Sequence, residues 1–146
     1  MEAKFSPKVK EVISFSREEA LRLKHDQIGI EHLLLGLIRE GDGMAIKVLR
    51  SLDIDIALFR KKIEDAIKDR VTTIPGNVNS LPLTKQAEKV LKITYLEARI
   101  SKSELIGTEH LLLSILRDND NLATQILNRF DVNYELVKET LEYHST

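Results

Sequence analysis

The sequence contains no cysteine and no tryptophan, and only 3 of its 146 residues are proline. Without cysteine there is neither a disulfide framework nor a thiolate metal site, which fits a reducing compartment. Lys and Arg total 22 against 23 Asp and Glu, so a net charge of −1 gives no overall attraction to nucleic acid or anionic lipid. No apolar run approaches the ~18 residues of a membrane span, and the N-terminal MEAKFSPKVKEV lacks the apolar core of a signal peptide. We therefore expect a cytoplasmic protein that binds neither membrane nor nucleic acid.

Catalytic motifs are absent as well. The chain has no His-Glu-x-x-His zinc motif, no Gly-x-Ser-x-Gly nucleophile elbow and no phosphate-binding Gly-x-x-x-x-Gly-Lys-Ser/Thr loop. Glu31 and His32 are adjacent, so on a helix their side chains point about 100° apart rather than toward each other. We expect His25 and His144 to be solvated. These absences predict that the domain is not an enzyme and holds no metal.

The strongest feature of the sequence is an internal duplication. The stretch IGIEHLLLGLIRE at residues 28–40 returns as IGTEHLLLSILRD at residues 106–118, and this offset of 78 residues aligns the two halves without a gap from Phe5 onward. We expect one domain over residues 1–146, with a first repeat at about 5–70 and a second at about 83–143. The intervening linker, at about 71–82, concentrates Pro, Gly and Asn, which are typical of loops.

Each repeat has the pattern of four helices. Ser6-Pro7 and Thr84 are typical first-helix starts, and Asp55 and Asn133 are good N-caps for the fourth helix. Apolar residues follow the spacing of a core-facing stripe in the second helix at Ile30, Leu33, Leu34, Leu37 and Ile38, and in the third at Met44, Ala45, Val48, Leu49 and Leu52. No strand-like alternation persists. The sequence predicts an all-α fold of eight helices, arranged as two four-helix repeats with pseudo-twofold symmetry.

A Gly-x-Glu-His motif begins the second helix of each repeat. Glu31 and Glu109 fall in the first turn, where the helix dipole favours a carboxylate by ~0.3–1 kcal/mol. Thr108 is able to cap its helix, whereas Ile30 at the matching position is not. One interpretation is a helix cap with a histidine beside the core. The other is a pair of surface carboxylates that receive a guanidinium or ammonium group, with helix N-termini nearby for an anion.

The duplicated Gly-x-Glu-His-Leu-Leu-Leu and the LIREGDG turn resemble the N-terminal domain of Clp-family AAA+ unfoldases, most closely the ClpC type. The resemblance covers essentially the whole chain. It implies a non-catalytic module that receives client and adaptor proteins for an ATP-dependent unfoldase working with a protease. ATP is implied only for downstream modules, so we expect no cofactor here and a monomeric domain. A freestanding helical scaffold that regulates a protease or another partner is the alternative.

The resemblance also implies binding residues. Some ClpC-type domains recognise phosphoarginine through the glutamate of each motif copy, which places that role on Glu31 and Glu109. Thr108 would complete the second pocket, and the first copy lacks this threonine. The phosphoryl group would then lie against the helix N-termini near Ser6 and Thr84.

Adaptors and cyclic peptide ligands are implied at the N-terminal ends of the first and fifth helices. Phe5 and Leu83 occupy equivalent places there. The alternative for both residues is a hydrophobic staple, in which a residue before the N-cap packs back on its own helix. The two interpretations are compatible, since a staple at the edge of a domain stays partly exposed.

Overall fold

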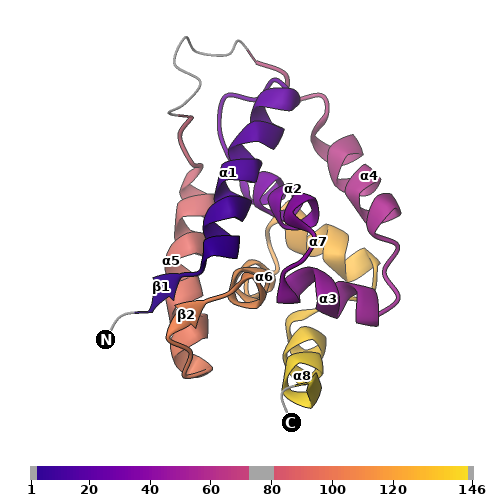
Figure 1. The fold of residues 1–146 in the computed structure, drawn as a ribbon. Coiled ribbons are helices and arrows are strands. Elements are labelled where there is room, and N and C mark those ends of the chain that lie inside the picture. The colour runs from indigo at the N-terminus through magenta and orange to yellow at the C-terminus, as the bar shows by residue number, and fades with distance from the viewer. Residues whose placement is uncertain (1–2, 73–80, 145–146) are drawn as a thin grey trace.

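The computed structural model describes residues 3–72 and 81–144, which form eight helices and two short strands (Figure 1). The first repeat contains β1 (Lys4–Phe5), α1 (Pro7–Arg22), α2 (Ile30–Glu40), α3 (Met44–Ser51) and α4 (Ile56–Ile67). The second contains α5 (Lys85–Ile100), β2 (Leu105–Ile106), α6 (Thr108–Leu116), α7 (Leu122–Arg129) and α8 (Tyr134–His144). The predicted all-α fold of eight helices is confirmed. Residues 73–80 of the predicted linker lie outside the described residues.

The local structure of the two repeats agrees at the predicted offset. The side chains of Ser6, Thr84, Asp55 and Asn133 each accept a hydrogen bond from the backbone amide three residues later, as predicted for N-caps. Non-glycine residues with a left-handed φ of 56–62° also recur 78 residues apart, Lys24 with Lys102 and Asp53 with Asp131. Helix starts and helix exits therefore follow the same geometry in both repeats, which supports the duplication independently of side-chain identity.

The repeats are joined by a reciprocal pairing of extended segments. β1 pairs in parallel with β2, which sets Phe5 opposite Ile106, and an isolated parallel bridge joins Ile28 to Leu83. Ile28 and Leu83 are the 78-residue counterparts of Ile106 and Phe5. Each repeat thus places the segment before its first helix beside the segment before the second helix of the other repeat. Figure 1 shows β1 and β2 side by side, next to α5 and below the lower end of α1.

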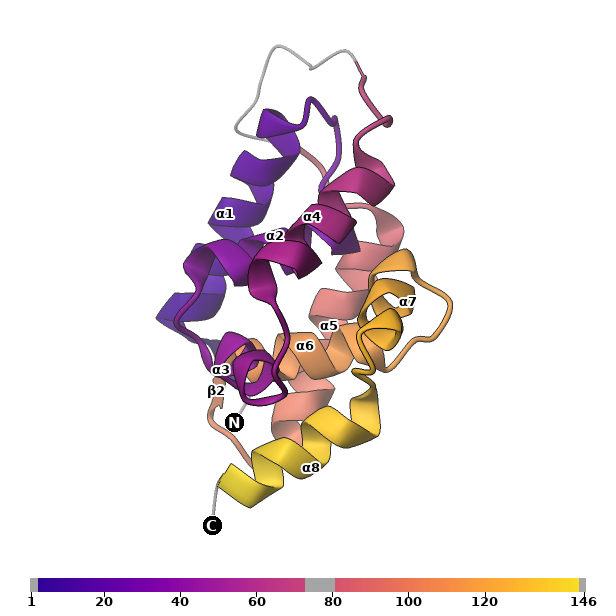
Figure 2. The same cartoon turned by 90° about the vertical axis from the view of Figure 1, so that its right-hand side faces the viewer.

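The predicted leucine stripe lies in a core that both repeats share. Leu34 and Leu112 are 1% and 0% exposed and belong to one continuous apolar cluster. In Figure 2, α8 passes below α6 and covers the core from that side. The prediction was wrong for Met44, whose side chain is exposed at the start of α3 and lines a surface cleft.

The first two helices of each repeat cross without a full side chain between them. A Cβ atom added to Gly36 would lie 2.4 Å from Ser16 Oγ and 2.5 Å from the carbonyl oxygen of Val12. The counterpart of Gly36 is Ser114, whose hydroxyl donates a hydrogen bond to the carbonyl oxygen of Val90 at 2.6 Å. Both crossings therefore require a small residue, and the first tolerates only glycine.

Gly36→Ala should lower the free energy of unfolding by about 1–3 kcal/mol, because the added methyl group meets backbone atoms of α1 that cannot move aside. In an uncrowded helix interior the same change stabilises by roughly 0.5–1 kcal/mol, so the sign of the effect is diagnostic. Urea unfolding followed by circular dichroism measures it. Ser114→Ala is the matched control and should cost about 1 kcal/mol, since it removes only a hydrogen bond. A Gly36→Ala variant as stable as the parent would contradict the close crossing.

Each repeat also buries one carboxylate between its first two helices. Glu19 and Glu97 are both 1% exposed. Arg39 Nη1 lies 3.3 Å from Glu19, and its counterpart Arg117 Nη2 lies 2.6 Å from Glu97. Arg22 adds two further hydrogen bonds to Glu19. Because an unpaired buried charge is strongly unfavourable, these pairs fix how α1 meets α2 and how α5 meets α6.

Candidate functional site

The histidine of each Gly-x-Glu-His copy caps the helix that it begins. The N-caps of α2 and α6 are Gly29 and Gly107, which have no side chain to accept a hydrogen bond. Their backbone amides donate instead to the ring Nδ1 atoms of His32, at 2.8 Å, and His110, at 2.9 Å. Both rings are buried, as the capping interpretation predicted. The two histidines are structural groups, and their Nδ1 atoms are not available to a ligand.

A second histidine extends this arrangement in the first repeat only. The Gly29 amide can only donate, so neutral His32 carries its proton on Nε2, from which it donates to His25 Nδ1 at 2.8 Å. Burial lowers the pKa of His32 to about 4, and burial likewise lowers the pKa of His25. His25 is 4% exposed, so the prediction that it is solvated was wrong. The side chain of His144 is outside the described part of the structure.

The first motif glutamate is already engaged within the chain. Glu31 is 8% exposed, and its Oε1 accepts a hydrogen bond from Arg70 Nη1 at 2.7 Å. The expectation of an open surface carboxylate was therefore wrong for Glu31. The pair lines a cleft of about 430 Å³ together with Thr84, Asp118 and Asp120. The two aspartates give this cleft an acidic wall, which disfavours an incoming phosphoryl group.

The second motif glutamate lies in a more open cleft. Glu109 is half-buried, and among the described residues no lysine or arginine pairs with it. Its carboxylate folds back over Gly107, where a Cβ atom would come within 2.0 Å of Glu109 Oε1. The glycine of the motif therefore makes room for this carboxylate. The surrounding cleft, of about 510 Å³, is lined by the apolar side chains of Met44, Ile100, Leu113 and Leu141, by the cation of Lys138 and by two further carboxylates, Glu97 and Glu142.

Two replacements account for the opening of the second cleft. The first repeat has Arg22 and His25 where the second has Ile100 and Ser103. Arg22 bonds to Glu19 and to Glu64, and His25 bonds to His32, so both fill the first repeat. Among the described residues nothing takes the place of His25 beside His110, whose Nε2 has no partner there. Both replacements are visible in the sequence when the two repeats are compared position by position.

Thr108 does not cap its own helix, and that expectation was wrong. Thr108 is 3% exposed, and its Oγ1 accepts a hydrogen bond from the Ala45 amide at 3.0 Å. It thereby caps α3, whose own N-cap, Gly43, has no side chain and no space for one beside Thr108. In the second repeat the N-cap of α7 is Asn121, which caps its own helix. The difference between Thr108 and Ile30 thus follows from how the third helix of the other repeat is capped.

The remaining predicted residues lie where the two repeats meet. Ser6 and Thr84 are engaged as helix caps, and of the two only Thr84 lines a cleft with a motif glutamate. Phe5 is half-buried, with its ring centroid 5.3 Å from that of Tyr95 on α5, so it packs on the other repeat. Leu83 packs against the core from a half-buried position.

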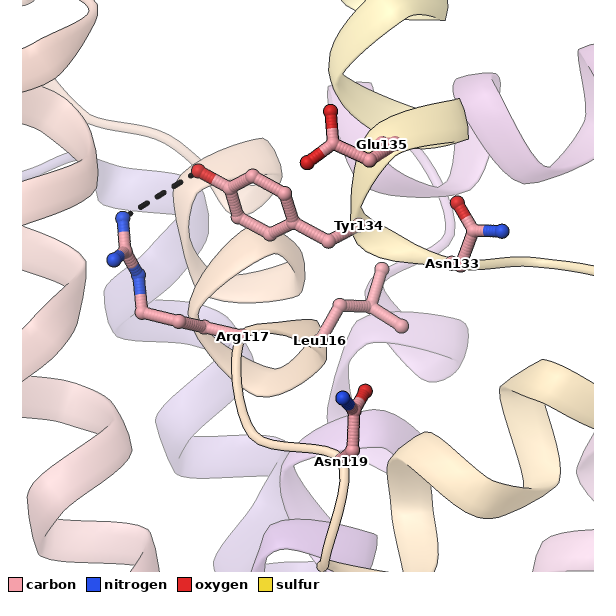
Figure 3. Close-up of a pocket in the computed structure, with 6 residues that line it drawn as sticks. All are labelled: Leu116, Arg117, Asn119, Asn133, Tyr134 and Glu135. Atoms are coloured by element: carbon pink, nitrogen blue, oxygen red, sulfur yellow. Dashed lines mark hydrogen bonds between the residues drawn. The ribbon is translucent and has the colours of Figure 1, made fainter.

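A further cleft, of about 440 Å³, lies between α6 and α8 (Figure 3). Its cation is Arg117, which points toward the Tyr134 hydroxyl, and both groups bond to the buried carboxylate of Glu97. The cation of this cleft is therefore already committed, and the remaining charged side chain that lines it is Glu135. In the described ranges, 3–72 and 81–144, no cluster of three His, Cys, Asp or Glu side chains is positioned to hold a metal ion. No helix in those ranges is long and apolar enough to cross a bilayer.

Known proteins share both this sequence pattern and this fold. The negative regulator of genetic competence ClpC/MecB of Bacillus subtilis is 34% identical over 139 residues, which are 95% of this chain and 17% of that protein. The ATP-dependent Clp protease ATP-binding subunit ClpC of Staphylococcus aureus is 36% identical over 134 residues, which are 89% of this chain and 15% of that protein. The chain thus spans less than a fifth of the length of these relatives.

Solved structures agree on the fold. The N-terminal domain of the chaperone ClpD from Arabidopsis thaliana superposes with a TM-score of 0.75 at 22% identity, covering 97% of this chain and 95% of that one. The family model of the Clp repeat N-terminal domain matches residues 4–143. Since that match includes both Gly-x-Glu-His copies and all eight helices of the described structure, this protein belongs to the Clp repeat N-terminal domain family.

Proposed function

We propose that this chain is the substrate- and adaptor-recognition domain of a ClpC-like unfoldase that works with a protease. Three observations support the proposal. The chain belongs to the Clp repeat N-terminal family, it matches a small part of much longer relatives, and one of these is named as the ATP-binding subunit of a Clp protease. In the described residues the buried histidines His32 and His110 act as helix caps, so they do not form a catalytic pair with the neighbouring glutamates. The clefts and their charged groups are the features that remain for binding a partner.

The ligand group that fits best is a guanidinium, and the observation that carries this choice is the contrast between the two repeats. In the first repeat the motif glutamate already holds an arginine side chain, that of Arg70. In the second repeat the equivalent Glu109 has a cleft but, among the described residues, no basic partner. The Arg70–Glu31 pair is therefore our guide to the contact that Glu109 is able to make with an arginine side chain. We infer that Glu109 receives an arginine side chain of a client protein.

A phosphoryl group on that arginine is a suitable second contact. A single exposed carboxylate–guanidinium pair contributes only roughly 0–1 kcal/mol, so useful affinity needs further interactions. Lys138 lies on the wall of the same cleft and is able to pair with a phosphoryl group. The apolar side chains of Met44 and Ile100 line the same cleft and are suited to contact the methylene groups of an arginine side chain. Proteins that carry phosphoarginine are therefore the proposed clients. Glu109 would bind the guanidinium group, and Lys138 would bind the phosphoryl group.

Titration calorimetry with phosphoarginine and with plain arginine tests this proposal. We expect the parent to prefer phosphoarginine, and Glu109→Gln, which keeps the side-chain shape without the charge, to lose at least tenfold in affinity. Lys138→Ala should weaken phosphoarginine binding while leaving arginine binding unchanged. Glu31→Gln should have little effect, because Arg70 already occupies that carboxylate.

The control for each variant is its circular dichroism spectrum and unfolding midpoint, which should match those of a folded domain. Unchanged phosphoarginine binding in folded Glu109→Gln would rule out Glu109 as the receptor. If the parent binds neither ligand, the recognition of arginine is refuted, and adaptor docking at Phe5 and Leu83 becomes the function to test by pull-down with defined adaptor peptides.

A further inference from the structure

Arg70 is held in place by more than its ion pair. It lies three residues beyond α4, and its backbone amide donates to the carbonyl oxygen of Ile67 at 3.1 Å, which extends the last helical turn. Two residues later, the Thr72 amide donates to the carbonyl oxygen of Lys24 at 2.9 Å, in the turn after α1. The backbone is thus anchored on both sides of Arg70. The guanidinium reaches the 11%-exposed carboxylate of Glu31 while 54% of the Arg70 side chain stays exposed.

We propose that Arg70 is a resident competitor, an arginine of the chain itself that occupies the first guanidinium site and leaves the second as the one open site. Arg70 is thus the residue that determines which repeat binds a client. This inference rests on the proposed function, because it assumes that the motif glutamates are guanidinium receptors. It adds that the two copies are not equivalent and that the domain takes one marked arginine rather than two.

The energetic argument is one of effective concentration. A tethered group on a short, anchored segment competes with a free ligand as if it were present at a concentration on the order of millimolar. A client arginine at micromolar concentration therefore fails to displace Arg70 unless it gains much more than one ion pair, which on its own contributes little. The acidic wall formed by Asp118 and Asp120 makes that gain smaller for a phosphorylated ligand.

Both clefts are lined by three acidic side chains, which are Glu31, Asp118 and Asp120 in the first and Glu97, Glu109 and Glu142 in the second. The difference lies in how the cation of each cleft is used. Arg70 is bonded to Glu31 in the first cleft, whereas Lys138 lines the second cleft without an ion pair to Glu109. The second cleft therefore offers both a carboxylate and a separate cation to a ligand of mixed charge.

The first test needs no client. Arg70→Ala removes the guanidinium but leaves the carboxylate and the space, so added ethylguanidinium at millimolar concentration should raise its unfolding midpoint. The same additive should raise the midpoints of the parent and of Arg70→Ala/Glu31→Gln by less, because in these two proteins only the Glu109 site is open to it. Lys68→Ala is the matched control, since it removes an exposed cation from the same end of α4 without touching Glu31. Arg70→Gln, which keeps a donor and most of the length, replaces Arg70→Ala if the alanine variant does not fold.

The second test counts sites by calorimetry with phosphoarginine. We expect one site in the parent, two in Arg70→Ala and one in Arg70→Ala/Glu109→Gln, and the site opened by Arg70→Ala should be the weaker one because of its acidic wall. Two sites in the parent, or one in folded Arg70→Ala together with no rescue by ethylguanidinium, would overturn the inference. If neither protein binds phosphoarginine but ethylguanidinium rescues Arg70→Ala, the proposed client is wrong, while the role of Arg70 as occupant of a guanidinium site is supported.

Discussion

Leu34→Ala and Leu112→Ala should each lower the free energy of unfolding by about 2–5 kcal/mol. The two leucines are counterparts in the two repeats, they are 1% and 0% exposed, and they lie in one continuous core. Truncation leaves a cavity that the surrounding helices fill only in part, which adds to the lost burial of apolar surface. Because the core is shared, each variant should unfold in a single transition at a lower urea concentration.

Leu58→Ala is the control for this pair. Leu58 is 44% exposed on α4, so its truncation should change stability by no more than about 0.5 kcal/mol. If the Leu34 and Leu112 variants unfold at the same urea concentration as Leu58→Ala, the stripe does not face a common core. Two separate transitions in either variant would instead show that the repeats unfold independently.

Acidification from pH 7.5 to pH 5 should destabilise the domain by about 2 kcal/mol through His32 alone. Burial lowers the pKa of His32 from 6.5 to about 4 in the folded state. Between these values the unfolded chain binds a proton that the folded chain does not, so stability is complete above pH 6.5 and is lost as the pH falls toward 4. Burial lowers the pKa values of His25 and His110 in the same direction, and these rings add to the loss.

His32→Gln separates this titration from the capping role of the ring. Glutamine at the third helical position is the usual acceptor for an N-cap amide, so it preserves the bond from Gly29 but does not titrate. Urea unfolding at pH 7.5 and pH 5 should show a smaller difference for His32→Gln than for the parent. An equal pH dependence in the two proteins would refute the assignment to His32. Burial acts to raise the pKa of Glu19, but its hydrogen bonds and ion pairs with Arg22, Arg60 and Arg39 outweigh burial and hold that pKa below its usual value, so this carboxyl group stays ionised over most of the interval.

Local signals predicted the elements of the fold well. The N-caps at Ser6, Thr84, Asp55 and Asn133 depend on a side chain and an amide three residues later, which lie within one short stretch of sequence. The core stripe depends on helical periodicity, which is also local. The strands were not predictable in this way, because each is two residues long and exists only through its partner about 100 residues away.

The candidate site was harder to predict for the same reason. Thr108 had the right chemistry for a cap, but the helix that it caps belongs to the other repeat. His25 looked like a surface residue until α2 brought His32 against it. The partner of Glu31 is Arg70, 39 residues away and outside any motif. For Thr108 and Glu31 the residue type was informative, and the missing information was which distant segment the fold places beside it.

The reciprocal strand pairing has a consequence for how the chain is made. A nascent chain leaves the ribosome from its N-terminus, and domains fold as units as their residues appear. β1 precedes α1 in the sequence, yet its partner β2 ends at Ile106. The N-terminal end of α3 likewise has its cap only once Thr108 has been synthesised. The first repeat therefore emerges with an unpaired strand and an incompletely capped helix, and the contacts that complete both form only after Ile106 and Thr108 have left the ribosome.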